Sequence, residues 1–182
     1  MVRTEIRIGG FGGQGVVLAG VLLGQAALNS GRYAVQTQSY GAEARGGAAR
    51  SEVILSDEPV LYPEVITPDV MAVLSQAALD KYLPDLKPDG LLILDADLVS
   101  DIPNGLTCSV EKGRFAHVAG ENLGRQIVAN IVMLGYVQKS ARLVEEGALR
   151  EAVKAGVPKG TEELNLKALD AGMRLAEAGH RG

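Results

Sequence analysis

The sequence predicts a single α/β domain over residues 1–182, with a mostly parallel sheet, helices on both faces and a helical C-terminal third. Strand-like and helix-like segments alternate over the first two thirds of the chain, which is typical of a parallel sheet covered by helices. Two of the strand-like segments are continuous apolar runs, as strands buried on both faces are. A length of 182 residues with 47% hydrophobic residues suits one globular domain.

The first elements form a strand, a tight turn and a helix. Residues 6–8 alternate apolar and polar side chains, and glycines then interrupt the pattern. Residues 15–28 are apolar on nearly every face of a helix, so we expect that helix to be covered on several sides. The Asn-Ser-Gly that ends at Gly31 is a C-terminal stop signal, and a second strand is expected over residues 33–38.

The middle of the chain supplies the rest of the predicted sheet. Residues 39–50 show neither helical nor strand periodicity and are interpreted as a shaped loop that leads into a strand at residues 51–56. Residues 70–74 and 91–94 are the two apolar runs and are predicted to be buried strands. A helical pattern covers residues 76–86, and a more polar candidate strand covers residues 106–110.

The last third is predicted to be three helices. From Glu121, apolar residues recur at helical spacing and predict a helix of roughly twenty residues. Residues 143–155 have the mixed charges of a surface helix. Thr161 is the expected N-cap of a helix over residues 162–178, whose first turn carries two glutamates.

Composition excludes several classes of function. With 18 basic and 22 acidic residues the net charge is −4, and no segment concentrates Lys and Arg, so nucleic acid is not an expected partner. No signal-peptide core and no apolar run of about 18 residues is present, so we expect no membrane association. The single cysteine, Cys108, favours a reducing cytoplasm and cannot hold a four-thiolate iron–sulfur cluster. Any redox metal must therefore belong to another chain.

A glycine-rich motif follows the first predicted strand and opens the first predicted helix. Gly10, Gly12, Gly13, Gln14 and Gly15 fit the pattern G-x-G-x-x-G of Rossmann-like domains. Backbone N–H groups at such a helix start favour an anion or cofactor. The alternative, which we favour, is that the glycines only permit close packing of helix and strand.

A bound nucleotide is disfavoured by what surrounds this motif. A dinucleotide fold places an acidic residue about 20 positions beyond the glycines, where it binds the ribose. Residues 33–39 contain neither Asp nor Glu. A Walker lysine is missing as well, because Val16 and Val17 follow the motif.

The predicted loop over residues 39–50 is a second candidate site. It combines a phenol, both signs of charge and several glycines between two strands, and such loops often carry function. Arg45 and Arg50 are the candidates for binding a carboxylate or phosphate. The alternative is an ordinary connection with a local Glu43–Arg45 pair. The candidate residues here are Tyr40, Gly41, Glu43, Arg45, Gly46, Gly47 and Arg50, and Asn130 in the apolar helix joins them because a buried amide needs hydrogen-bond partners.

These residues carry a family resemblance that spans almost the whole chain. The glycine motif, the block at residues 38–47 and the Arg-Ser-Glu-Val that begins at Arg50 resemble the gamma subunit of 2-oxoacid:ferredoxin oxidoreductases. Further matches are Pro68-Asp69, Asn130, Leu134-Gly135 and the pattern Asn165-x-x-Ala168-Leu169-x-x-Gly172. The chain is most similar to the separate gamma chain of the 2-oxoglutarate type. The small subunit of indolepyruvate oxidoreductases shares the domain but usually differs in the block before Arg-Gly-Gly.

The resemblance implies one chain of a multi-subunit enzyme. Such a complex decarboxylates a 2-oxoacid on thiamine diphosphate and Mg, transfers the acyl group to coenzyme A, and passes electrons through iron–sulfur clusters to ferredoxin. We expect the cofactors to reside on the alpha, beta and delta subunits, this chain to bind none of them alone, and the isolated chain to be inactive. Two alternatives remain open: a free-standing anion- or nucleotide-binding module, and the indolepyruvate small subunit.

Overall fold

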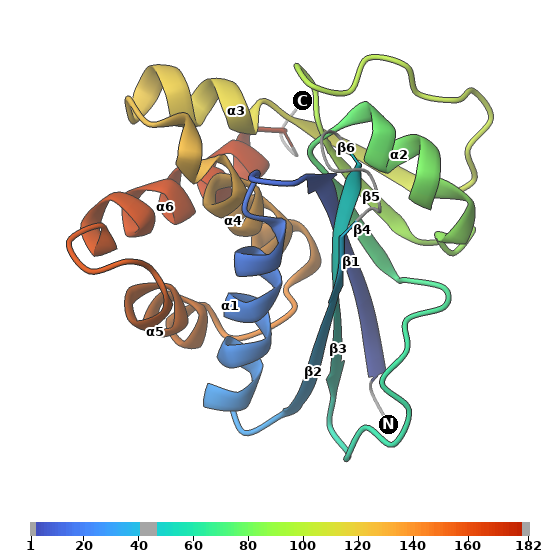
Figure 1. The fold of residues 1–182 in the computed structure, drawn as a ribbon, viewed down its shortest axis with the longest axis horizontal. Helices are drawn as coiled ribbons and strands as arrows, with labels where there is room; N and C mark the ends of the chain where they lie inside the picture. The colour runs from blue at the N-terminus through green and yellow to red at the C-terminus, as the bar shows by residue number, and fades with distance from the viewer. Residues whose placement is uncertain (1–2, 41–46, 180–182) are drawn as a thin grey trace.

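The computed structural model describes residues 3–40 and 47–179, and within them six strands form one sheet in the order β2-β3-β1-β4-β5-β6 (Figure 1). The strands are β1 (Arg3–Phe11), β2 (Tyr33–Ser39), β3 (Ala48–Ser56), β4 (Val70–Val73), β5 (Leu91–Asp95) and β6 (Ser109–Gly113). Strand β3 is antiparallel to both of its neighbours, whereas β1, β4, β5 and β6 are parallel to one another. The predicted mostly parallel α/β sheet is confirmed.

Helices cover both faces of this sheet, as predicted (Figure 1). The helices are α1 (Val16–Asn29), α2 (Gln76–Tyr82), α3 (Phe115–His117), α4 (Ala129–Ala141), α5 (Glu146–Gly156) and α6 (Glu162–Gly179). The larger apolar core lies between the sheet and α1, α4, α5 and α6, and a smaller one lies beneath α2 on the opposite face. None of the helices in the described ranges is long and apolar enough to cross a membrane.

Strands β1 and β3 are longer than the sequence patterns indicated. Glycines were expected to end β1, but Gly9 and Gly10 pair with Arg50 and Ala49 of β3, and β1 continues to Phe11. Gly9 is needed for packing, since a Cβ there would lie 3.0 Å from the Cβ of Ala78 in α2. The loop predicted over residues 39–50 is therefore too long: its last three residues are strand.

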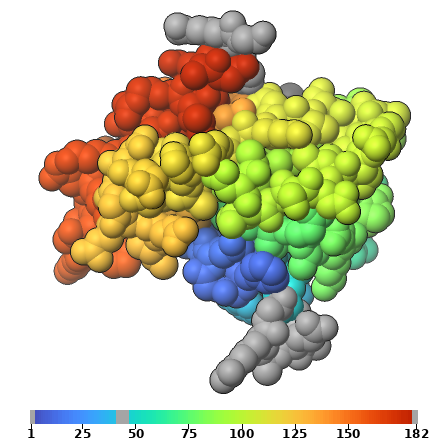
Figure 2. All heavy atoms as spheres, turned by 90° about the horizontal axis from the view of Figure 1, so that it is seen from above, coloured from blue at the N-terminus to red at the C-terminus, as the bar shows by residue number. Residues whose placement is uncertain are grey.

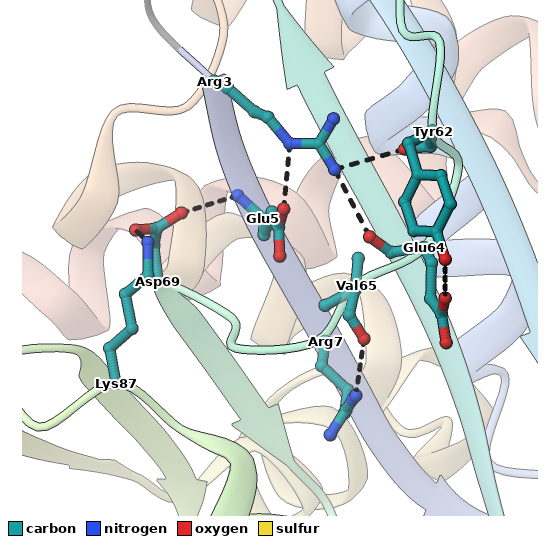
Figure 3. A network of polar contacts seen from close by, with 8 residues as sticks. All are labelled: Arg3, Glu5, Arg7, Tyr62, Glu64, Val65, Asp69 and Lys87. Atoms are coloured by element: carbon teal, nitrogen blue, oxygen red, sulfur yellow. Dashed lines mark hydrogen bonds and ion pairs between the residues drawn. The ribbon is translucent and has the colours of Figure 1, made fainter.

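The segment between β3 and β4, residues 57–69, has no regular secondary structure and crosses the α2 face of the sheet (Figure 3). Arg3 donates to the carbonyl oxygens of Tyr62 and Glu64 at 3.3 Å each, and Arg7 donates to that of Val65 at 3.1 Å. At the end of the segment, Asp69 accepts from the backbone N–H of Glu5 at 2.7 Å. Hydrogen bonds from charged side chains of β1 thus hold this irregular segment against the sheet.

The predicted helix of roughly twenty residues from Glu121 is wrong in its first part. A π-helical turn, η2 (Val118–Asn122), and a 3-10 turn, η3 (Gln126–Val128), precede α4, which has 13 residues. Gly124 breaks the run because it adopts a φ of 68°, in the left-handed region that ends helices. The periodicity itself holds within α4, where Ile131 and Leu134 are buried.

The remaining elements agree with the prediction apart from their ends. Strand β6 starts three residues later than expected, and the pattern at residues 76–86 divides into α2 and a short 3-10 turn, η1 (Leu83–Asp85). Helix α6 follows Thr161, whose hydroxyl donates to the Pro158 carbonyl at 2.7 Å and accepts from the Asn165 amide at 3.0 Å. Helices α4 and α6 pack backbone to backbone where Gly135 and Gly172 cross.

Candidate functional site

The glycine loop, residues 11–15, joins the carboxyl end of β1 to α1. The N–H of Gln14 donates to the carbonyl of Phe11 at 3.1 Å, which closes a tight turn. The Gln14 side chain accepts from the Phe11 N–H at 2.6 Å and donates to the Leu74 carbonyl at 2.9 Å. Because Leu74 follows β4, one glutamine ties the loop to the neighbouring strand and fixes its position at the carboxyl end of the sheet.

The three glycines of the G-x-G-x-x-G pattern serve different purposes. A Cβ at Gly10 would lie 2.9 Å from Val16 Cγ1, so this glycine permits close packing of the helix start. Gly15 has a φ of 73°, and a Cβ there would collide with the side-chain amide of Asn130. At Gly12, by contrast, no described atom lies within 4 Å of the position of a Cβ. At Gly12, as at Gly13 beside it, a ligand or another chain therefore has room to approach the backbone.

Asn130 is the sequence-distant partner of this loop. It is buried at the start of α4, and its amide donates to the carbonyl of Gly15 at 3.0 Å. The same carbonyl accepts the N–H of Ala19 in the first turn of α1 at 3.1 Å. The bond from Asn130 thus holds α4 against the start of α1 and satisfies the buried amide that the sequence singled out.

Three hollows meet at the glycine loop on the carboxyl end of the sheet. Figure 2 looks onto this end, where the loop (blue) reaches the surface between the residues that precede α4 (yellow) and those that follow β4 (green). The largest hollow measures about 360 Å³, and the other two about 200 and 230 Å³. The largest is lined by Gly13, Gln14, Leu74, Leu98, Ala116, Gln126, Ile127 and Ala129, none of which is charged. It lies between β1 and β4, whose following helices cover opposite faces, which is where open α/β sheets bind ligands or partners.

Large apolar side chains stand exposed around the glycine loop. Ile127 is 71% exposed and Tyr40 is 62% exposed, and Phe11 and Leu98 are exposed beside them. Ile127 and Leu98 line the largest hollow, whereas Phe11 and Tyr40 line the 200 Å³ hollow with Gly12. The described part of this rim is neutral and apolar, which suits contact with another protein surface more than binding of an anion alone.

Arg50 lies on the other side of the sheet from α1. Its guanidinium is 5.7 Å from the centre of the Tyr82 ring in α2 and 3.7 Å from a Glu52 carboxylate oxygen. Arg7, on the same face, binds the same carboxylate and lies 5.5 Å from the same ring. Burial raises the pKa of the Tyr82 phenol, while the positive charges of Arg50 and Arg7 act to lower it. Arg50 belongs to a network that packs α2 on the sheet.

Comparison with known proteins places the chain in a family. The family model "Pyruvate ferredoxin/flavodoxin oxidoreductase" matches residues 5–175. The chain belongs to this family.

Individual relatives align over nearly their whole length. The "2-oxoglutarate synthase subunit KorC" of Methanocaldococcus jannaschii is 49% identical over 178 residues, covering 97% of this chain and 95% of the relative. The same-named subunit of Methanothermobacter marburgensis is 48% identical over 99% of this chain and 100% of its own length. The solved "keto/oxoacid ferredoxin oxidoreductase, gamma subunit" of Geobacter sulfurreducens superposes with a TM-score of 0.86 at 44% identity, covering 96% of this chain and 99% of that one.

A larger solved structure shares the fold. The 2-oxoglutarate:ferredoxin oxidoreductase of Magnetococcus marinus, solved with 2-oxoglutarate, coenzyme A and succinyl-CoA, superposes with a TM-score of 0.87 at 22% identity. The match covers 98% of this chain and 32% of that one. At this identity the likeness concerns the fold alone.

In this member of the pyruvate ferredoxin/flavodoxin oxidoreductase family, the structure gathers some of the predicted site residues and separates others. Those brought together at the glycine loop are Gly10, Gly12, Gly13, Gln14, Gly15, Tyr40 and Asn130. Gly47 directly precedes β3 and is half-buried, and Arg50 points to the α2 face. Gly41, Glu43, Arg45 and Gly46 lie outside the described residues.

The sequence patterns did not single out Arg7, whose side chain is only 2% exposed. It binds Glu52 with its Nε at 2.8 Å and its Nη2 at 2.7 Å, and it also pairs with Asp85. A signal was available, because Arg7 stands between two isoleucines in a strand and Glu52 stands in an equally apolar one. The two are direct cross-strand partners, and opposite charges at such positions stabilise pairing.

The strand order gives a structural reason against dinucleotide binding. Strand β3 lies between β1 and β2, so the end of β2 is about 10 Å from β1 instead of about 5 Å. An acid placed at the end of β2 would be one strand too far from the glycine loop to bind a ribose. Within residues 3–40 and 47–179, no group of three His, Cys, Asp or Glu residues is arranged to hold a metal ion.

Gly12 and Gly13 differ in backbone conformation. Gly13 has a φ of 92°, and Gly12 does not have a positive φ. We expect Gly13→Val to lower the free energy of unfolding by about 1–3 kcal/mol, because a branched residue is strained there. Gly12→Val should change it by less than about 0.5 kcal/mol. Urea unfolding followed by circular dichroism measures both, and equal losses would contradict the distinction.

Proposed function

We propose that this chain is the gamma-type subunit of a 2-oxoglutarate:ferredoxin oxidoreductase. In that reaction 2-oxoglutarate and coenzyme A give succinyl-CoA and CO2, and two electrons pass to ferredoxin. The chain would serve by packing the glycine-loop face, defined by residues 11–15 with Tyr40, Leu98 and Ile127, on the catalytic subunits. The observation that carries the proposal is the apolar rim exposed around a loop whose Gly12 backbone is open. The relatives named as 2-oxoglutarate synthase subunits support the choice of substrate.

The cofactor chemistry is assigned to other subunits. A single cysteine cannot ligate an iron–sulfur cluster, and the described residues that line the hollows at the glycine loop have neutral side chains. Thiamine diphosphate and its Mg supply the decarboxylation chemistry when bound, and these residues do not suit a diphosphate with a metal ion. The contribution of this chain is to orient and cover the partner's surface and to exclude water from it.

Co-expression with the catalytic subunits tests the proposal. We expect a complex that reduces ferredoxin with 2-oxoglutarate, whereas the purified 19.0 kDa chain alone carries no visible chromophore and no activity. Ile127→Asp should abolish co-purification because it buries a charge in the apolar contact. Leu61→Asp, at an exposed leucine in the segment before β4, should assemble normally. Stoichiometric flavin or iron on the isolated chain, or assembly unaffected by Ile127→Asp, would contradict the proposal. If the complex is active with indolepyruvate and inactive with 2-oxoglutarate, the substrate assignment changes to indolepyruvate.

Arg45 is proposed to supply positive charge near the coenzyme A or substrate-carboxylate path. A planar guanidinium paired with phosphate or carboxylate away from water contributes roughly 2–5 kcal/mol, so Arg45→Ala should raise the Michaelis constant for coenzyme A at least tenfold. Arg174→Ala, at an exposed site on α6, is the control. Weaker assembly with an unchanged Michaelis constant would make residues 40–47 an interface loop. No change in either would make them an ordinary solvated connection.

A further inference from the structure

The two edges of the sheet differ sharply in how they are protected. Strand β6, at one edge, has five residues and carries Glu111 and Lys112, and the Ser140 hydroxyl of α4 donates to Glu111 at 2.6 Å. Strand β2, at the other edge, has seven residues with no charge, proline or glycine. Soluble proteins usually blunt a free edge with such residues, because it offers unpaired backbone groups to any other strand. The seven residues of β2 itself include none of these side chains.

Helix α1 exposes apolar side chains above the same edge. The side of α1 that carries Gly24 faces β2, since a Cβ there would lie 3.9 Å from the Cβ of Gln36. Val21 is 44% exposed and Leu28 is 51% exposed, and helical geometry places both next to Gly24. The opposite flank of α1 is covered, because Leu22 meets Gly156 of α5. Figure 1 shows α1 running alongside β2, with α5 on its other side.

The charge pattern identifies the occupant of this surface. We infer that the α1–β2 surface, formed by Val21, Leu28 and the outer edge of β2, binds a second copy of this chain, with the two β2 strands paired antiparallel about a twofold axis. In such a pairing each strand meets its own sequence reversed, so a charge near the axis faces its like. The 14 residues of α1 and the seven of β2 contain no charged side chain. A different partner chain would impose no such restriction.

The pairing explains two features that the fold and the proposed function leave open. The sequence of α1 is apolar on nearly every face, yet within the described chain one flank lacks a cover. A second α1 packed across the axis would cover that flank, while the sheet would continue through both copies. The glycine-loop face lies at the carboxyl end of the strands and stays free for other subunits, so the inference does not depend on the proposed function.

Sedimentation equilibrium of the full chain, at protein concentrations from about 1 to 100 μM, tests the inference. We expect a mass about twice 19.0 kDa, and Thr37→Lys in β2 or Val21→Lys in α1 should weaken association at least tenfold with unchanged circular dichroism. The matched controls are Val110→Lys on the β6 edge and Leu61→Lys, both at exposed apolar residues. Both control variants should remain dimeric. Backbone amides of β2 should also exchange hydrogen more slowly as protein concentration rises.

Three results would overturn the inference. The first is a monomer over the whole concentration range. The second is a pair that neither Thr37→Lys nor Val21→Lys weakens, which would move the contact to another face. The third is a monomeric chain whose binding to a different subunit is lost in these two variants, which would make the surface a contact between unlike chains.

Discussion

Replacing Arg7 by methionine is expected to lower the free energy of unfolding by about 3–5 kcal/mol. The side chain is buried, and its loss would leave the buried carboxylate of Glu52 with only the more distant Arg50 guanidinium, 3.7 Å away, and would remove the donor to the Val65 carbonyl. The segment at residues 57–69 would lose one of the contacts that fix it on the sheet (Figure 3). Urea unfolding monitored by circular dichroism gives the difference.

Two further variants separate the electrostatic cost at the buried Glu52 carboxylate from the loss of packing. Arg3→Met, on the same strand but half-exposed and paired with Glu5, should cost less than about 1 kcal/mol. The double variant Arg7→Met with Glu52→Leu removes both charges together, so it should be more stable than Arg7→Met alone. If Arg7→Met costs no more than Arg3→Met, the buried network does not stabilise the fold.

Gly172→Ala is the second substitution with a large expected effect. A Cβ at Gly172 in α6 would lie 2.8 Å from the carbonyl carbon of Val132 and 2.9 Å from the backbone nitrogen of Tyr136, both in α4. These neighbours are main-chain atoms, which no rotamer change can move aside. The helices must separate, and we expect a loss of about 1–3 kcal/mol even though alanine favours helix.

Gly147→Ala in α5 is the matched control, and its expected effect on the free energy of unfolding is zero or of the opposite sign. No described atom lies within 4 Å of its Cβ position, so alanine should leave stability unchanged or raise it by up to about 1 kcal/mol. Displacement of α4 in Gly172→Ala should also disturb the bond between Asn130 and Gly15, which hydrogen exchange at the start of α1 would report. Equal effects of the two substitutions would show that the helix crossing tolerates a side chain.

The sequence allowed the fold class to be predicted because local patterns carry it. The apolar runs that became β4 and β5 and the stop signal at Gly31 depend only on neighbouring residues. The orientation of β3 was also accessible, since the connection from β2 is too short for the crossover that parallel strands need. The break before α4 was harder, because a glycine tolerated inside a helix and one that ends it look alike in sequence.

The candidate site was only partly predictable for a different reason. The glycine motif is local, and its position before α1 could be recognised from spacing. The bond from Asn130 to Gly15 joins residues that are 115 positions apart, and no pattern in a single sequence relates them. Arg50 was misplaced because the end of the loop was misjudged: one register position in a strand decides which face a side chain occupies.

The place of β1 in the sheet has a consequence for how the chain folds during synthesis. Of the six strands in this sheet it is synthesised first, yet Ile6 pairs with Val53 of β3 on one side and Val70 of β4 on the other. One side of this strand therefore stays unpaired until β4 has left the ribosome. The hairpin of β2 and β3 closes over a far shorter stretch, so it should form first and accept β1 afterwards. Newly made chains are most exposed to aggregation or chaperone capture in that interval.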